Sequence, residues 1–338
     1  MDYGRVIKDA WDLTWRHRFL WLLGFFVMSG AQSCGSSLTY NYDQSNYQQM
    51  PPESRQAISA FLAWVQANAG LLIALAILLL ALGIVFLVVS FIAQGGLTRA
   101  GADLRRGVPV SPGDAWRYGL RFFWRYVGLF FLLALVGFGI ALVTALLFAL
   151  FFGILSLLGD GGRIIFGIIG ALIAIAAAIA FVVFAIALGI VVTYAQRAIA
   201  IEDVGVFDAL GRGTDLLQRR IGPSLVFWLL SIVLSIGAVL ALMVVFAIVL
   251  VPLALFGVLI YFASTATPVA FIIYLVIAFV VFLAVAFVVS AIVNTFFWNY
   301  WTCAYLDLTA PATPEPVVPA EPLPGEPYTP TPPTEPTA

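Results

Sequence analysis

The apolar residues of the chain fall into six long blocks, and this distribution constrains the fold more than any other feature of the sequence. The blocks span residues 19–31, 71–93, 126–158, 164–194, 225–261 and 269–300. A helix that crosses the hydrocarbon of a bilayer needs about 20 consecutive apolar residues. The first block is shorter, but Trp15 and Trp21 flank it as interfacial anchors. The sequence therefore predicts an all-α membrane protein in which residues 1–308 form six transmembrane helices.

The low charge content of the chain argues in the same direction. Charged residues make up 10% of the chain and hydrophobic residues 63%. Soluble domains carry about 25% charged residues, because a surface in contact with water requires them. The composition therefore argues against a soluble enzyme. The net charge of −1 also supplies no basic field for a nucleic-acid partner.

Basic residues mark one side of the predicted membrane domain. Of the 16 Lys and Arg residues, all but Arg55 and Arg163 lie before the first block, between the second and third blocks, or between the fourth and fifth. Loops rich in Lys and Arg remain in the cytoplasm. Both termini are therefore expected in the cytoplasm, and Arg197 is assigned to a cytoplasmic loop. Residues 309–338, rich in Pro, Thr and Glu, are expected to form a disordered cytoplasmic tail.

Three cytoplasmic segments resemble one another. Each contains an Asp-Ala pair, at Asp9-Ala10, Asp114-Ala115 and Asp208-Ala209, and each pair precedes a basic stretch and an odd-numbered block. This pattern predicts three repeats, each an interfacial amphipathic helix followed by a transmembrane hairpin. Matches this short also arise by chance.

The middle interfacial helix has the clearest signal. Ser111 and Asp114 have the spacing of a capping box around Pro112, which suits a first helical turn. Candidate contacts to anionic lipid head groups follow on neighbouring faces of the helix: Trp116, Arg117, Arg121 and Arg125. The alternative is that the three interfacial helices only position the spans.

A polar cluster lies near the end of the last block. Ser290, Asn294 and Asn299 lie near one face of the predicted helix. They are candidates for the lining of a polar cavity, or for hydrogen bonds between helices. The six blocks contain no Asp, Glu, Lys, Arg or His, which argues against a proton- or cation-coupled carrier.

The sequence offers no catalytic, cofactor-binding or metal-binding set. The only metal-ligating residues of the His and Cys types are His17, Cys34 and Cys303, which are far apart in the chain. The neighbouring acids Glu202 and Asp203 are expected to serve as charges at a helix start. We therefore expect a protein that is not an enzyme.

Short motifs carry a family resemblance over residues 1–308. They are Ile7-Lys8-Asp9-Ala10-Trp11, Gly95-Gly96-Leu97, and Ala200-Ile201-Glu202-Asp203 with Asp208-Ala209-Leu210. The chain resembles uncharacterised bacterial membrane proteins, including the membrane domain attached to some glycerophosphoryl diester phosphodiesterases. The catalytic domain of those enzymes has no counterpart here, so their activity is not implied.

Three functions remain open at this point. The first is a non-enzymatic, multi-pass protein of the inner (cell) membrane that engages anionic lipids or a membrane or cytoplasmic protein partner through its interfacial helices. The second is a transporter or lipid-flipping permease with Asn294 and Asn299 along its path. The third, a membrane-embedded lipid enzyme, is least supported because acid, base and metal ligands are missing.

Overall fold

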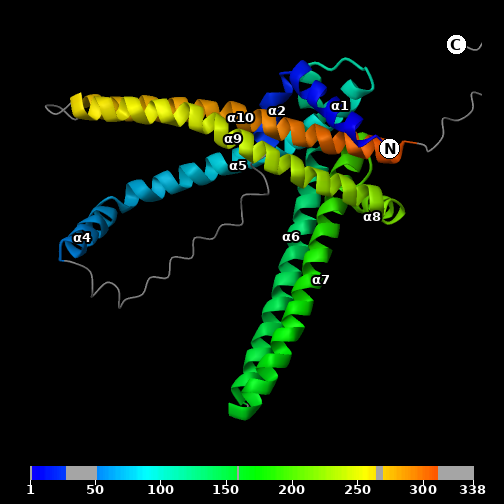
Figure 1. Ribbon diagram of the computed structural model, residues 1–338, viewed down its shortest axis with the longest axis horizontal. Coiled ribbons are helices and arrows are strands. Elements are labelled where there is room, and N and C mark those ends of the chain that lie inside the picture. The colour runs from blue at the N-terminus through cyan, green and yellow to red at the C-terminus, as the bar shows by residue number, and fades with distance from the viewer. Residues whose placement is uncertain (1, 28–51, 158–159, 264–268, 311–338) are drawn as a thin grey trace, which may run out of the picture. The chain divides into compact units, whose positions relative to one another are not determined.

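The computed structural model describes residues 2–27, 52–157, 160–263 and 269–310, and every element in these ranges is an α-helix (Figure 1). The helices are α1 (Tyr3–Arg16), α2 (Leu20–Val27), α4 (Pro52–Ala67), α5 (Ala69–Arg105), α6 (Pro112–Leu157), α7 (Asp160–Ile201), α8 (Val206–Arg219), α9 (Ile221–Ala263) and α10 (Val269–Thr309). Packing separates a helical unit, Met1–Leu308, from the segment Thr309–Ala338.

Five of the described helices are long and apolar enough to cross a membrane: α5, α6, α7, α9 and α10. The shortest, α5, has 37 residues, which at about 1.5 Å per residue exceeds the roughly 30 Å of bilayer hydrocarbon. Leucine, isoleucine, valine and phenylalanine side chains along these helices are exposed. Exposed apolar surface on this scale requires lipid around it, so the chain is a membrane protein.

The first predicted span is covered only in part. Helix α2 contains eight residues of it, Leu20–Val27, whereas residues 28–31 lie outside the described ranges. Cys34 and residues 311–338 of the predicted tail also lie outside them. The five long helices match the other five predicted spans.

Several helices continue beyond the ends predicted for their spans. Helix α5 ends at Arg105 rather than residue 93, and α7 ends at Ile201 rather than residue 194. Polar residues mark the predicted ends in the sequence, but Gln94, Thr98 and Arg197 are buried against other helices. The polar positions therefore belong to helix contacts and do not end the helices.

The middle amphipathic segment differs from the prediction of a separate interfacial helix. Residues 112–125 form the first turns of α6 and run into the span without a break. The predicted start is confirmed, because the Asp114 amide donates to Ser111 Oγ at 3.2 Å and the Ser111 amide donates to Asp114 Oδ2 at 3.2 Å. In contrast, α1 and α8 are separate helices that precede α2 and α9.

Small residues allow α5 and α6 to pack closely. A Cβ atom added at Gly119 of α6 would collide with the Ile92 carbonyl of α5, and one at Gly96 would collide with the Ala115 carbonyl. Backbones approach this closely only where side chains are absent. Two of the motif residues, Gly95 and Gly96, therefore lie at this helix crossing.

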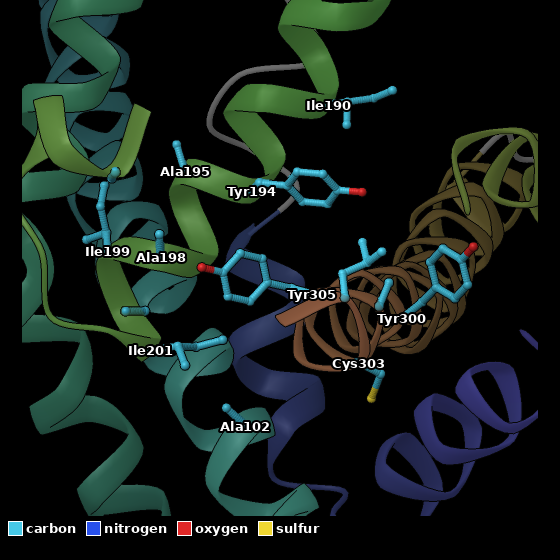
Figure 2. Close-up of a cluster of buried hydrophobic side chains, with 14 of the residues drawn as sticks. Ala102, Ile190, Tyr194, Ala195, Ala198, Ile199, Ile201, Tyr300, Cys303 and Tyr305 are labelled. Carbon is cyan, nitrogen blue, oxygen red and sulfur yellow. The ribbon is translucent and has the colours of Figure 1, made fainter. Parts of the chain in front are cut away.

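The buried core gathers at the predicted cytoplasmic ends of the long helices. Figure 2 shows part of it, with Tyr194 of α7 and Tyr305 of α10 between their helices. Their ring centroids are 6.1 Å apart. This packed end, and not the lipid-exposed middle of the spans, contains the polar side chains that could select a ligand.

Candidate ligand cavity around Arg197

Arg197 is the most deeply buried charged residue in the described part of the chain. It lies on α7, four residues before the helix ends, and is 2% exposed. Its assignment to a cytoplasmic loop was wrong, because α7 continues through this position and turns the side chain into the bundle. A buried ionisable residue near the end of a span is a candidate functional site.

The surroundings of Arg197 hold its guanidinium in place without neutralising its charge. Nη1 donates to the Thr193 carbonyl at 3.1 Å and to Gln196 Oε1 at 3.0 Å. The guanidinium carbon lies 4.3 Å from the ring centroid of Trp298 on α10. Nε is buried and has no hydrogen-bond partner. No salt bridge joins Arg197 to a carboxylate of the described residues.

A polar chain of hydrogen bonds fixes Trp298 beneath the guanidinium. Its indole Nε1 donates to Thr98 Oγ1 of α5 at 2.7 Å. Thr98 Oγ1 lies 3.4 Å from the Tyr126 hydroxyl of α6, which donates to the Gln196 carbonyl at 2.7 Å. Four spanning helices therefore contribute to the position of the arginine.

Arg197 lines a cavity of about 380 Å³ between α2, α5, α7, α9 and α10. This volume is within the range of about 300–1,000 Å³ that is common for small-molecule sites. The polar residues of the lining are Gln94, Thr193, Gln196, Arg197, Ser231, Ser235 and Asn294. Asn294 Nδ2 is buried without a hydrogen-bond partner, as is Arg197 Nε. The described lining contains no carboxylate.

These features favour an anion in the cavity. A guanidinium without a counter-ion is costly to keep in a low-dielectric site, and the stacking on Trp298 offsets about 2 kcal/mol of that cost. Arginine also binds phosphate and carboxylate oxygens through its planar donors. Arg197 and Asn294 both line the cavity, and each has a buried side-chain nitrogen without a hydrogen-bond partner, so the cavity offers an uncompensated positive charge to an anionic group.

Of the three polar residues predicted in the last span, only Asn294 lines this cavity. Asn299 is fully buried elsewhere, and its Nδ2 donates to Thr14 Oγ1 of α1 at 3.3 Å. Ser290 is half-buried and does not belong to the lining. The structure thus separates a cavity residue from a residue that joins two helices. Arg197 is the residue that sequence reasoning missed, and a one-turn extension of the fourth block would have included it.

The predicted head-group residues of α6 lie on a different surface. Arg121 and Arg125 both form ion pairs with Asp203, in the connection between α7 and α8. The Arg121 side chain is nevertheless 66% exposed, Trp116 is 37% exposed, and Arg117 is also exposed. These side chains keep a basic, aromatic surface, although two of the arginines also serve the fold.

Asp203 has an unusual backbone and a shifted pKa. Its φ of 58° is in the left-handed region, where Asn and Asp are the most tolerated side chains after Gly. The hydrogen bond from Arg125 holds the pKa of its carboxyl below the ordinary value, and the charges of Arg125 and Arg121 add to the effect. Glu202 pairs with Arg212 and accepts from the Tyr305 hydroxyl. Both acids therefore join helices, rather than serving as charges at the start of α8.

A second ionic cluster joins residues near the beginning and the end of the sequence of the helical unit. Arg105 of α5 donates from Nη2 to Asp9 at 2.9 Å and to Asp307 at 2.7 Å, and from Nη1 to the Cys303 carbonyl at 2.8 Å. Arg5 approaches the same Asp307 carboxylate at 3.6 Å. The charges of this cluster compensate one another, unlike the charge of Arg197.

Neither the remaining large cavity nor the His, Cys, Asp and Glu side chains of the described ranges offer a second polar site. A cavity of about 940 Å³ lies between α9 and α10 and is lined almost entirely by aliphatic and aromatic side chains. It contains no charged group that would select a ligand. Within the described ranges, His, Cys, Asp and Glu side chains form no group of three that could hold a metal ion.

The comparisons with known proteins concern the same helical unit. No curated protein and no solved structure matches the chain. One family model, described as a family of unknown function (DUF7544), matches residues 10–311, from α1 to just beyond the end of α10. Because this match covers most of the sequence, the chain belongs to the DUF7544 family.

Proposed function

We propose that this protein is a non-enzymatic, multi-pass protein of the bacterial inner membrane that binds an anionic lipid in the cavity around Arg197. The observation that carries the proposal is the buried Arg197 guanidinium, which lines the cavity and has an Nε without a hydrogen-bond partner. The neighbouring Asn294 amide adds a second unused donor. Lipid phosphate is the abundant anion of the surrounding phase and suits both donors.

The interfacial arginines would attract lipid head groups to the protein surface before a lipid enters the cavity. Arg117, Arg121 and Arg125 with Trp116 form a basic, aromatic surface at the start of α6 that would attract anionic head groups. The same surface could meet an acidic protein partner at the membrane. The ion pairs with Asp203 make it a less complete site than the cavity, because two of its charges are already compensated.

The ionic cluster at Arg105 supports six spans with both ends in the cytoplasm. Asp9, Arg105 and Asp307 are in contact, so all three lie on one side of the membrane. Between Asp9 and Arg105 the chain crosses once through α5, and it returns to the same side only if the first apolar block also crosses. The basic residues on this side support its assignment to the cytoplasm. The three Asp-Ala segments are consistent with three repeats of an amphipathic helix followed by a transmembrane hairpin.

A permease is the second candidate, and the position of Asn294 favours it. The cavity lies between helices from both halves of the chain, as expected for a substrate path. A bound lipid and a transported lipid would use the same donors. Flux of a fluorescent anionic lipid across vesicles that contain the protein, lost in Asn294→Leu, would distinguish transport from binding alone.

Lipid retention tests the proposed function directly. The protein is purified in a mild detergent from membranes that contain phosphatidylglycerol, and native mass spectrometry counts the lipid that stays bound. We expect the wild-type chain to retain phosphatidylglycerol, and Arg197→Gln and Asn294→Leu to lose it, with about a tenfold lower occupancy for the loss of one charged hydrogen bond.

Arg219→Gln is the matched control, because it removes the same charge from an exposed position of α8, and Arg117→Gln tests the interfacial surface. Equal retention by wild type and Arg197→Gln, with both proteins folded, contradicts the cavity proposal. Loss of lipid in Arg117→Gln but not in Arg197→Gln moves the site to the interfacial surface.

A further inference from the structure

A second cavity adjoins the one around Arg197 and has the opposite character. It measures about 430 Å³ and lies between α5, α6 and α7. Its lining includes Phe91, Leu129, Phe130, Leu133, Ile140 and Leu188, and none of its described lining residues is charged. An apolar cavity of this size suits a flexible hydrocarbon chain better than a polar ligand.

The two cavities share part of their lining. Gln94 of α5 and Thr193 and Gln196 of α7 border both of them. These are the uncharged polar residues beside Arg197, and Gln196 accepts one of its hydrogen bonds. A ligand that places its charge at Arg197 therefore meets the apolar cavity next to the same residues.

The apolar cavity opens towards the lipid-facing side of α6. Val136, one of its lining residues, is 41% exposed. Two glycines of the lining, Gly137 on α6 and Gly189 on α7, have no heavy atom within 4 Å of an added Cβ. The absence of side chains at these positions leaves the space that a chain from the bilayer would occupy.

We infer that the two cavities form one bipartite site for an anionic lipid, with the anionic group at Arg197 and Asn294 and one acyl chain between α5, α6 and α7. The inference rests on the proposed binding function and adds the place of the acyl chain. Neither half is sufficient alone. The arginine supplies charge selection, and the apolar cavity supplies the affinity that comes from burying methylene groups.

Three probes separate the two halves of the site. Palmitoyl lysophosphatidylglycerol carries both the chain and the anion, glycerol phosphate carries only the anion, and monopalmitoylglycerol carries only the chain. Binding of each radiolabelled probe is measured with the full-length protein in phosphatidylcholine nanodiscs. We expect the lysolipid to bind at least about tenfold more tightly than either partial probe, because both halves contribute.

Leucine substitutions then close the apolar cavity without touching the arginine. Gly189→Leu and Gly137→Leu fill open space, and each displaced methylene of the ligand weakens binding by about fourfold. We expect the affinity of both variants for the lysolipid to fall by at least about tenfold, because that is the effect of displacing two methylenes. Their affinity for glycerol phosphate should equal that of the wild type. Gly139→Leu is the matched control, because Gly139 also has open space but does not line the cavity.

The outcomes distinguish a failure of the bipartite site from a failure of the proposed function. If Arg197→Gln weakens lysolipid binding but Gly189→Leu and Gly137→Leu do not, the chain site is wrong and the proposed function stands. If Arg197→Gln has no effect, the proposed function itself fails. Equal weakening by Gly139→Leu, or equal binding of monopalmitoylglycerol and the lysolipid, also overturns the bipartite site.

Discussion

At the scale of single residues, the charged side chains differ in the groups that compensate their charge. Arg105 has two carboxylate partners, and Asp203 has two arginine partners. Arg197 has an aromatic ring, a backbone carbonyl and a glutamine oxygen. Ion pairs that join helices account for the first two residues. A residue whose charge is stacked but not neutralised is better explained by a ligand.

The pairing of Asp203 predicts a pH-dependent stability. Its pKa in the folded protein is below the ordinary 3.8, so its contribution is complete above pH 3.8 and is lost as the pH falls through the lower, folded-state pKa. Asp203→Asn keeps a side chain that tolerates positive φ but removes the charge. We expect the wild type to be more stable than Asp203→Asn above this value in thermal denaturation in detergent. The difference should shrink as the pH falls below 3.8, and a constant difference would contradict the ion-pair role.

At the scale of helices, the close crossing of α5 and α6 positions the apolar cavity. The apolar cavity is lined by Gln94 and Phe91 of α5 and by Tyr126 and Leu129 of α6. Gly96 and Gly119 set the distance between the two helices. The crossing therefore determines how far the cavity walls stand apart.

A valine at Gly119 should disrupt this crossing. The added side chain collides with the Ile92 carbonyl, which belongs to a helix backbone and cannot move aside. Overpacking of this kind costs about 1–3 kcal/mol. We expect Gly119→Val to lower the thermal midpoint in detergent, and Gly139→Val, on the same helix in open space, to leave it near the wild-type value. Equal midpoints for the two variants would mean that the crossing is not tight.

The sequence predicts the helices better than it predicts the site. Long apolar blocks indicate spans because hydrocarbon allows little else, and the capping pair Ser111 and Asp114 indicates where α6 begins. The site depends on contacts between distant segments. Nothing near Arg197 in the chain indicates that Trp298, about a hundred residues later, lies against it. Asn294 and Asn299 also look equivalent in the sequence, and only the packing separates a cavity residue from a residue that bonds α1.

At the scale of the whole helical unit, the contact between Asp9, Arg105 and Asp307 predicts a topology that can be measured. Alkaline phosphatase, which is active in the periplasm, is fused after Asn68, and a fluorescent protein that matures in the cytoplasm is fused after Asp307. We expect both fusions to be active, because in the proposed topology residue 68 follows one crossing and residue 307 follows six. An inactive phosphatase after Asn68 would mean that the first apolar block does not cross.

The Arg105 cluster also sets an order of events in time. Asp307 follows Arg105 by 202 residues, and ribosomes add about 5–20 residues per second, so roughly 10–40 s pass before the second carboxylate is made. Until then the arginine has only Asp9. The contacts between Arg105 and the last helix can therefore form only after the rest of the helical unit has been synthesised. A chain released before residue 307 would leave that arginine with one of its two carboxylate partners.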